Sequence, residues 1–69
     1  MNREPVSSSN IQSIGYDSSD QILEIEFNNG AVYQYFDVPE HVYTELISSP
    51  SVGGYLAKSI KGNFRFSRV

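Results

Sequence analysis

Residues 23–35 constrain the fold of this chain more than any other segment. The run LEIEF at residues 23–27 alternates apolar and acidic side chains, which is typical of a β-strand with one buried face. The turn sequence NNG follows at residues 28–30, and the run VYQYF at residues 32–36 supplies a second strand. This order predicts an antiparallel β-hairpin.

Burial chooses between two registers of this hairpin. A two-residue loop would pair Phe27 with Val32, whereas a three-residue loop ending in a left-handed Gly30 would pair Phe27 with Ala31. A slip of one residue turns a whole strand over. Only the three-residue loop gathers the five large side chains on one face, namely Leu23, Ile25, Phe27, Tyr33 and Tyr35. We therefore expect that register, with Glu24, Glu26, Val32 and Gln34 on the other face.

The flanking segments predict one strand before the hairpin and two helices after it. Residues 11–17 form a strand whose Ile14 and Tyr16 join the apolar face if residues 17–20 form a four-residue loop. Pro39 suits the first turn of a helix that ends near residue 48. Its inward side chains are expected to be Val42, Tyr43, Leu46 and Ile47.

Ser51 can cap a second helix, which Gly62 ends. The inward side chains of this helix are expected to be Val52, Tyr55, Leu56 and Ile60. The sequence thus predicts an α+β domain: a three-stranded antiparallel β-meander with two helices packed on one face. Residues 63–69 alternate in a way that allows a short C-terminal edge strand.

The length of 69 residues allows one domain, which we place at residues 10–69 after a polar N-terminal lead at residues 1–9. A hydrophobic content of 39% excludes a disordered chain. The chain has no cysteine, no signal-like segment and no apolar run of membrane-spanning length, so a cytoplasmic location is the default expectation and no membrane partner is expected. A core this small gains from a partner surface, which makes self-association a reasonable expectation.

Charge is distributed unevenly along the chain. All eight acidic residues lie in residues 1–45, which carry a formal charge of −7, whereas residues 46–69 carry +4. These four cations alternate with aromatic residues, a combination that can pair with phosphates and stack on bases; they are Lys58, Lys61, Arg65 and Arg68. The simpler interpretation makes them solubilising groups around a core that contains the aromatic rings.

Two further sets of polar residues could carry chemistry. Glu24 and Glu26 form a carboxylate pair, but a strand face offers no cleft that would raise a pKa. The only histidine, His41, can share a helix face with Asp37 and Glu45, but a relay would also need a nucleophile and an oxyanion site. We therefore expect no catalytic residue, no metal site and no cofactor.

With these elements assembled, the sequence resembles the KTSC domain family, named after the C-terminal domain of some lysyl-tRNA synthetases. The motifs that carry the resemblance run through nearly the whole chain: Ser7-Ser8, Ile14-Gly15-Tyr16-Asp17, Leu23-x-Ile25-x-Phe27, Gly30, Tyr33-x-Tyr35, Val38-Pro39, Ser51, Tyr55 and Ile60-Lys61-Gly62. Members also occur as stand-alone bacterial and phage proteins. The resemblance implies no established activity, and an RNA-binding role has been supposed from the synthetase fusion.

These observations favour a small non-catalytic binding module. The first hypothesis is RNA binding through the basic C-terminal segment. The alternative is a protein-interaction or inhibitor module that acts through self-association or through the acidic sheet face. A third option is a small ligand held between subunits by Tyr33 and Tyr35, which can also form an exposed stacking platform if the other hairpin register holds.

Overall fold

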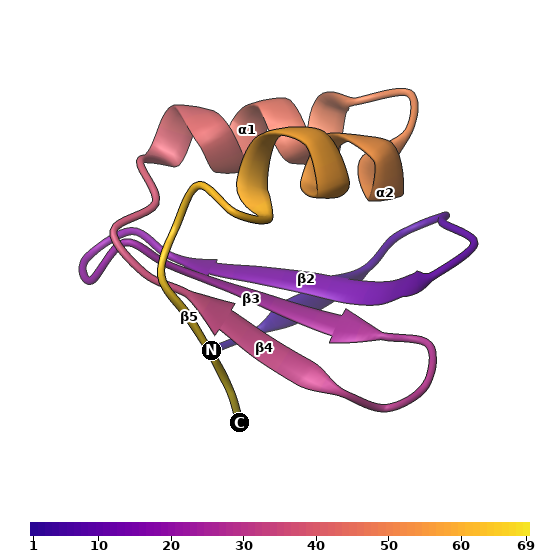
Figure 1. The fold of residues 1–69 in the computed structure, drawn as a ribbon, viewed down its shortest axis with the longest axis horizontal. Coiled ribbons are helices and arrows are strands. Elements are labelled where there is room, and N and C mark those ends of the chain that lie inside the picture. The colour runs from indigo at the N-terminus through magenta and orange to yellow at the C-terminus, as the bar shows by residue number, and fades with distance from the viewer.

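The computed structural model describes all residues from Met1 to Val69 and has two layers (Figure 1). One layer is an antiparallel sheet whose five strands lie in chain order. Helices cover one face of this sheet. The strands are β1 (Arg3–Pro5), β2 (Ile11–Asp17), β3 (Ile22–Phe27), β4 (Val32–Tyr35) and β5 (Phe66–Arg68). The α+β class is confirmed, but the expected three-stranded meander is only the centre of a larger sheet.

The central hairpin of β3 and β4 has the register that burial favours. The backbone N–H of Phe27 donates to the carbonyl of Ala31 over 2.8 Å, across a three-residue loop. Gly30 ends this loop with a φ of +90°, in the left-handed region where a Cβ would be unfavourable. Tyr35 is buried in the core and Tyr33 is half-buried at its border.

The strand β2 joins the hairpin through a turn at residues 18–21, one residue later than the expected loop at residues 17–20. Ile14 and Tyr16 pair with β3 residues on the inner face, so their predicted direction is confirmed. A β-bulge just after Ile11 inserts one extra residue, which lets Ile11 face inward as well.

Three helical segments form the second layer: α1 (Glu40–Ser48), α2 (Val52–Tyr55) and a π-helical turn η1 (Leu56–Ile60). The hydroxyl of Ser51 accepts a hydrogen bond from the backbone N–H of Gly54 over 3.2 Å, so the predicted cap is confirmed. The continuous helix expected up to Lys61 instead widens over η1, where the Lys61 N–H donates to the Leu56 carbonyl five residues earlier.

One prediction about α1 is wrong. Ile47 was expected to face inward, but 45% of it is exposed. Its neighbour Leu46 is fully buried, and consecutive helical residues point about 100° apart, so both cannot face the sheet squarely.

The N-terminal lead contains the strand β1, which was not expected. Arg3 pairs with Gly15 at the β1–β2 interface. The Arg3 guanidinium lies 3.3 Å from the Glu24 carboxylate and 3.9 Å from that of Glu26, on the outer face of the sheet. These contacts tie the lead to the sheet. At the opposite edge, β5 confirms the short C-terminal edge strand.

The hydrophobic core lies between the helices and the inner face of the sheet. Its fully buried side chains come mainly from β2, β3 and the helical layer: Ile11, Ile14, Leu23, Ile25, Val38, Leu46, Leu56 and Ile60. The inner face of β4 and β5 is less completely covered, because Tyr33 stays half-buried and Phe66 is exposed.

Candidate functional site

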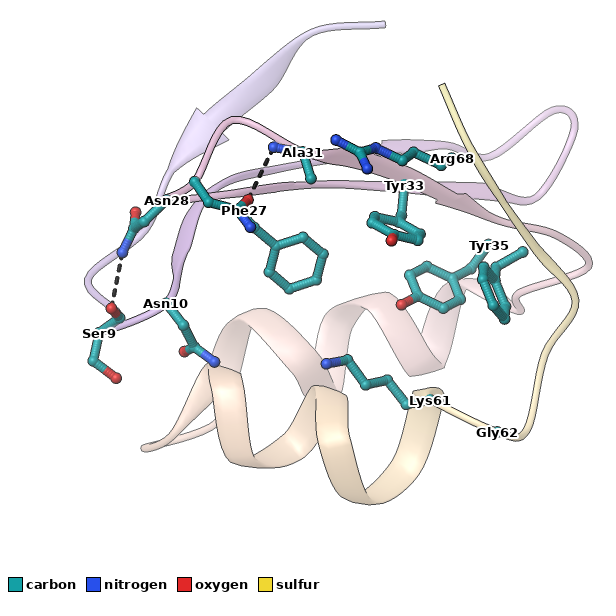
Figure 2. Close-up of a pocket in the computed structure, with 12 residues that line it drawn as sticks. Ser9, Asn10, Phe27, Asn28, Ala31, Tyr33, Tyr35, Lys61, Gly62 and Arg68 are labelled. Carbon is teal, nitrogen blue, oxygen red and sulfur yellow. Dashed lines mark hydrogen bonds between the residues drawn. The ribbon is translucent and has the colours of Figure 1, made fainter.

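A pocket of about 640 Å³ opens where the helical layer leaves the inner face of β4 and β5 uncovered (Figure 2). Four aromatic residues line it, together with two cations: Phe27, Tyr33, Tyr35, Phe66, Lys61 and Arg68. Polar residues of the β1–β2 and β3–β4 connections line its other end: Ser9, Asn10, Asn28 and Asn29. Segments far apart in the sequence therefore meet at this pocket.

Strand register explains why the rings and Arg68 lie together. Residues opposite each other in an antiparallel pair project to the same face of the sheet. Tyr35 pairs with Phe66 and Tyr33 pairs with Arg68, so β5 adds a ring and a cation to the inner face. The edge strand thus extends the core face of the hairpin into an accessible surface.

The rings contact one another at angles that leave ring faces open. Phe27 meets Tyr33 edge-on, with ring centroids 5.7 Å apart and an angle of 86° between the planes. Phe66 is tilted against both tyrosines, with each pair of centroids 5.8 Å apart. Phe66 is 58% exposed, which makes it the most accessible ring of the pocket. Such a surface offers an apolar ligand face-to-face or edge-to-face contact.

The structure separates the four cations that the sequence grouped. The Lys61 ammonium lies 5.3 Å from the centre of the Phe27 ring, and Arg68 lines the same pocket. Arg65 instead forms an ion pair with Asp37, with 2.8 Å between its nitrogen and the carboxylate oxygen. Lys58 is exposed on η1 and does not line the pocket. Lys61 and Arg68 are therefore the pair that share a site.

The phenol of Tyr35 is the titratable group most enclosed by this site. Burial raises its pKa above the ordinary value of 10.0, with a smaller contribution from the neighbouring Tyr33. The Tyr35 hydroxyl has no hydrogen-bond partner in the protein, although no buried side-chain polar atom is unpaired, so this hydroxyl retains contact with solvent. It stays protonated at neutral pH and can donate or accept a hydrogen bond in the pocket.

The other candidate residues lie elsewhere. Glu24 and Glu26 sit on the outer face, where Arg3 bridges them. Glu24 also accepts a hydrogen bond from the Gln34 amide over 2.8 Å, and Glu26 accepts one from the Ser13 hydroxyl over 2.9 Å. The acidic face is thus partly neutralised. His41 is exposed on α1, and no three metal-ligating side chains of His, Cys, Asp or Glu cluster anywhere.

Sequence reasoning included Phe66 only as one of the aromatic residues between the C-terminal cations, with the core as the simpler alternative, and it did not find Asn10. Alternation along β5 is the signal that could have placed Phe66 beside Arg68, because residues two apart on a strand share a face. No local pattern points to Asn10. Its side-chain oxygen accepts a hydrogen bond from the Ser8 hydroxyl over 3.2 Å, which turns the amide nitrogen toward the pocket side (Figure 2).

The fold and the site define a small α+β domain: helices on one face of a five-stranded antiparallel sheet, with an aromatic pocket where that cover ends. Comparison with known proteins gives this class a name. A family model for the KTSC domain matches residues 7–64, and the chain belongs to that family.

Its relatives fall into two kinds. A protein of Tsukamurella paurometabola is 40% identical over 62 residues, which are 90% of this chain and 92% of that protein. A lysine–tRNA ligase of Trichormus variabilis is 44% identical over 59 residues, which are 86% of this chain but only 10% of the ligase. The crystal structure of a KTSC domain protein from Yersinia pestis matches with a TM-score of 0.93 and 43% identity, over 99% of this chain and 96% of that one. The family therefore includes small proteins of this size and short parts of much larger ones.

None of the helices here has the length and apolar character that a membrane crossing requires.

Proposed function

We propose that this chain is a non-catalytic binding module that binds RNA through Lys61 and Arg68 at the aromatic pocket. The observation that carries the proposal is the meeting of two cations and four aromatic rings at one accessible site. Proteins that bind single-stranded RNA combine these two features, because cations pair with phosphates and rings stack on bases.

The relatives supply independent support. Lysine–tRNA ligases contain a segment at least 41% identical to this chain over 59 residues, and the name of those proteins states a tRNA substrate. A short domain within an enzyme that handles RNA is well placed to contact that RNA. The ligase activity itself is stated of proteins of which this chain matches a tenth.

The charge of the whole chain argues for a local contact over a diffuse one. With a formal net charge of −3, the molecule as a whole is repelled by a phosphate backbone. Binding must therefore depend on few, well-placed cations. The ion pair of Arg65 with Asp37 balances the charge of that guanidinium, which leaves Lys61 and Arg68 as the contacts expected to matter.

The alternative, a protein-interaction module that acts through the acidic sheet face, has less support. Arg3 lies within 4 Å of both Glu24 and Glu26, so this face presents a mixed charge pattern. Self-association remains a prediction that sedimentation of the purified protein would test.

Salt dependence of binding tests the RNA proposal. We expect a short single-stranded RNA to bind with an affinity that falls as salt rises from about 20 to 200 mM, with a log–log slope near −1.4 for two phosphate contacts. Lys61→Gln and Arg68→Gln should each reduce this slope by about 0.7. The matched controls Lys58→Gln and Arg65→Gln should change it less. Fluorescence anisotropy measures the RNA affinity of the parent and the four variants at each salt concentration. An affinity of the parent that does not change with salt would contradict the proposal.

A further inference from the structure

We infer that the aromatic pocket accepts one unpaired nucleotide, with its base against Phe66 and Tyr33 and its phosphate at Arg68. This inference rests on the proposed RNA-binding function and states which part of an RNA the pocket recognises. The ligand class is a nucleotide with a free base face, whether it belongs to an RNA loop or end or is a free mononucleotide.

The size of the pocket sets the size of the occupant. Its volume of about 640 Å³ falls within the range of roughly 300–1,000 Å³ typical of small-molecule sites. One nucleotide fits such a site, whereas a base-paired helix keeps its base faces stacked inside and offers mainly phosphates and groove edges. The pocket therefore suits a base that has left its stack.

Ring exposure indicates where that base lies. A base needs an open aromatic face, and Phe66 is 58% exposed. Two neighbours hold the ring, because Phe66 contacts Tyr33 and Tyr35 at centroid distances of 5.8 Å. An exposed ring that is already positioned loses little conformational freedom when a base stacks on it. Phe27, half-buried and partly covered by Lys61, forms the floor.

Polar groups around the rings match the remaining parts of a nucleotide. Arg68 lies opposite Tyr33 on the same face of the sheet and lines the same pocket, so its guanidinium can pair with the phosphate of a base stacked there. The Lys61 ammonium faces the pocket from the helical side (Figure 2). The amide of Asn10 and the hydroxyl of Tyr35 can hydrogen-bond to base edges or to ribose hydroxyls. The pocket thus offers ring faces to the base and polar groups to the phosphate, the ribose and the base edges.

Binding of adenosine 5′-monophosphate and of short RNAs tests this inference. In amide-resolved NMR we expect the mononucleotide to shift signals of β4, β5 and Lys61, and ribose 5-phosphate to shift them much less. Adenosine 5′-monophosphate should also displace a labelled single-stranded RNA. A double-stranded RNA of the same length should bind more weakly than the single strand.

Substitution of Phe66 provides the sharpest variant. Phe66→Ala should weaken single-strand binding about 5- to 150-fold, the range that loss of one base–aromatic stack produces, with little change in the salt slope. Phe66→Tyr should restore binding, since it keeps the ring. Ile47→Ala removes another exposed apolar side chain, outside the pocket, and should bind as the parent does. Thermal melts should show that all three variants fold.

The outcomes separate the two proposals. If RNA binds with the expected salt slope but Phe66→Ala binds equally well, or if duplex and single strand bind alike, the nucleotide pocket is wrong while the RNA proposal stands. If the mononucleotide shifts the pocket signals but no RNA binds, the pocket is a nucleotide site and the RNA proposal is wrong. If neither ligand binds, both proposals are overturned.

Discussion

Tyr35 is the residue that joins the hydrophobic core to the pocket. The residue is only 3% exposed and belongs to the core cluster, while its hydroxyl has no hydrogen-bond partner in the protein and the residue also lines the pocket. Burial raises its pKa above 10.0 because the phenolate would lose more hydration in the folded state than in the unfolded one. The ring and the hydroxyl of Tyr35 should therefore have separable effects on the stability of the protein.

We predict that Tyr35→Phe changes stability by less than about 1 kcal/mol at neutral pH, because no hydrogen bond within the protein is lost. Above pH 10.0 the two proteins should diverge. A raised pKa in the folded state gives stability that is complete below the unfolded pKa and is lost as pH rises through the folded pKa. The parent should thus lose stability in alkali, and the variant should lose less.

Urea unfolding between neutral pH and about pH 11 measures this difference. Tyr16 serves as an internal reference, because burial raises its pKa as well and it is retained in both proteins. Some alkaline loss should therefore persist in Tyr35→Phe. Curves that run parallel for parent and variant would show that folding does not raise the pKa of Tyr35.

At the scale of elements, the edge strand β1 depends on the absence of a side chain at Gly15. A Cβ placed there would lie 2.8 Å from the backbone oxygen of Asn2 and 2.9 Å from the Arg3 side chain. Real Cβ atoms do not approach backbone oxygens that closely. Gly15 is therefore what permits β1 to pack against β2 at this register.

We predict that Gly15→Ala destabilises the protein by about 1–3 kcal/mol, the usual cost of overpacking. The sign of the change in the free energy of unfolding is informative, because Gly→Ala in an unobstructed strand usually stabilises a protein by about 0.5–1 kcal/mol. Amide exchange of β1 should accelerate as the strand is displaced. Gln12→Ala changes an exposed residue of β2, the strand that contains Gly15. It should leave the stability of the protein and the amide exchange of β1 near the parent values.

The elements differ in how far the sequence predicts them. The hairpin register follows from alternation and from Gly30, since only one register places all five large side chains on the inner face of the sheet. By contrast, β1 has no alternation of its own, and its pairing with β2 and the contacts of Arg3 with Glu24 and Glu26 join residues distant in sequence, which a local pattern cannot indicate. The π turn at η1 and the outward direction of Ile47 are likewise set by packing against the sheet.

The candidate site was predicted only in its residue types. Cations and aromatic residues near the C-terminus indicated the chemistry, but their grouping depends on partners distant in sequence. Arg65 is taken up by Asp37, 28 residues earlier, whereas Arg68 is placed by its pairing with Tyr33. The four cations that lie close together in the sequence are thus divided in the fold: Lys61 and Arg68 line the pocket, whereas the other two do not.

At the scale of the whole molecule, charge and size act together on any anionic ligand. The extents of the molecule are 28 × 23 × 22 Å. The Debye length is about 30 Å at 0.01 M salt and about 8 Å at 0.15 M. At low salt a ligand in the pocket therefore interacts with every charge on the protein, whereas at physiological salt it interacts only with nearby charges.

Asp20 can distinguish long-range from short-range electrostatic effects, because it is a charged residue that does not line the pocket. It belongs to the turn that precedes β3, whereas the pocket reaches that end of the sheet only on the outer strands β4 and β5, through Tyr35 and Phe66. Its side chain is exposed and takes part in no ion pair or hydrogen bond. We predict that Asp20→Asn strengthens RNA binding at about 0.01 M salt and has no measurable effect at about 0.15 M.

The same anisotropy titration, run at both salt concentrations, measures this change. Ser18→Asn alters the same turn without a change in charge and should match the parent under both conditions. An equal gain at both salt concentrations would mean that Asp20 acts at short range, and thus that RNA contacts the turn end of the sheet. A gain confined to low salt would mean that the bound RNA lies more than about 8 Å from Asp20, as we expect for a ligand in a pocket that Asp20 does not line.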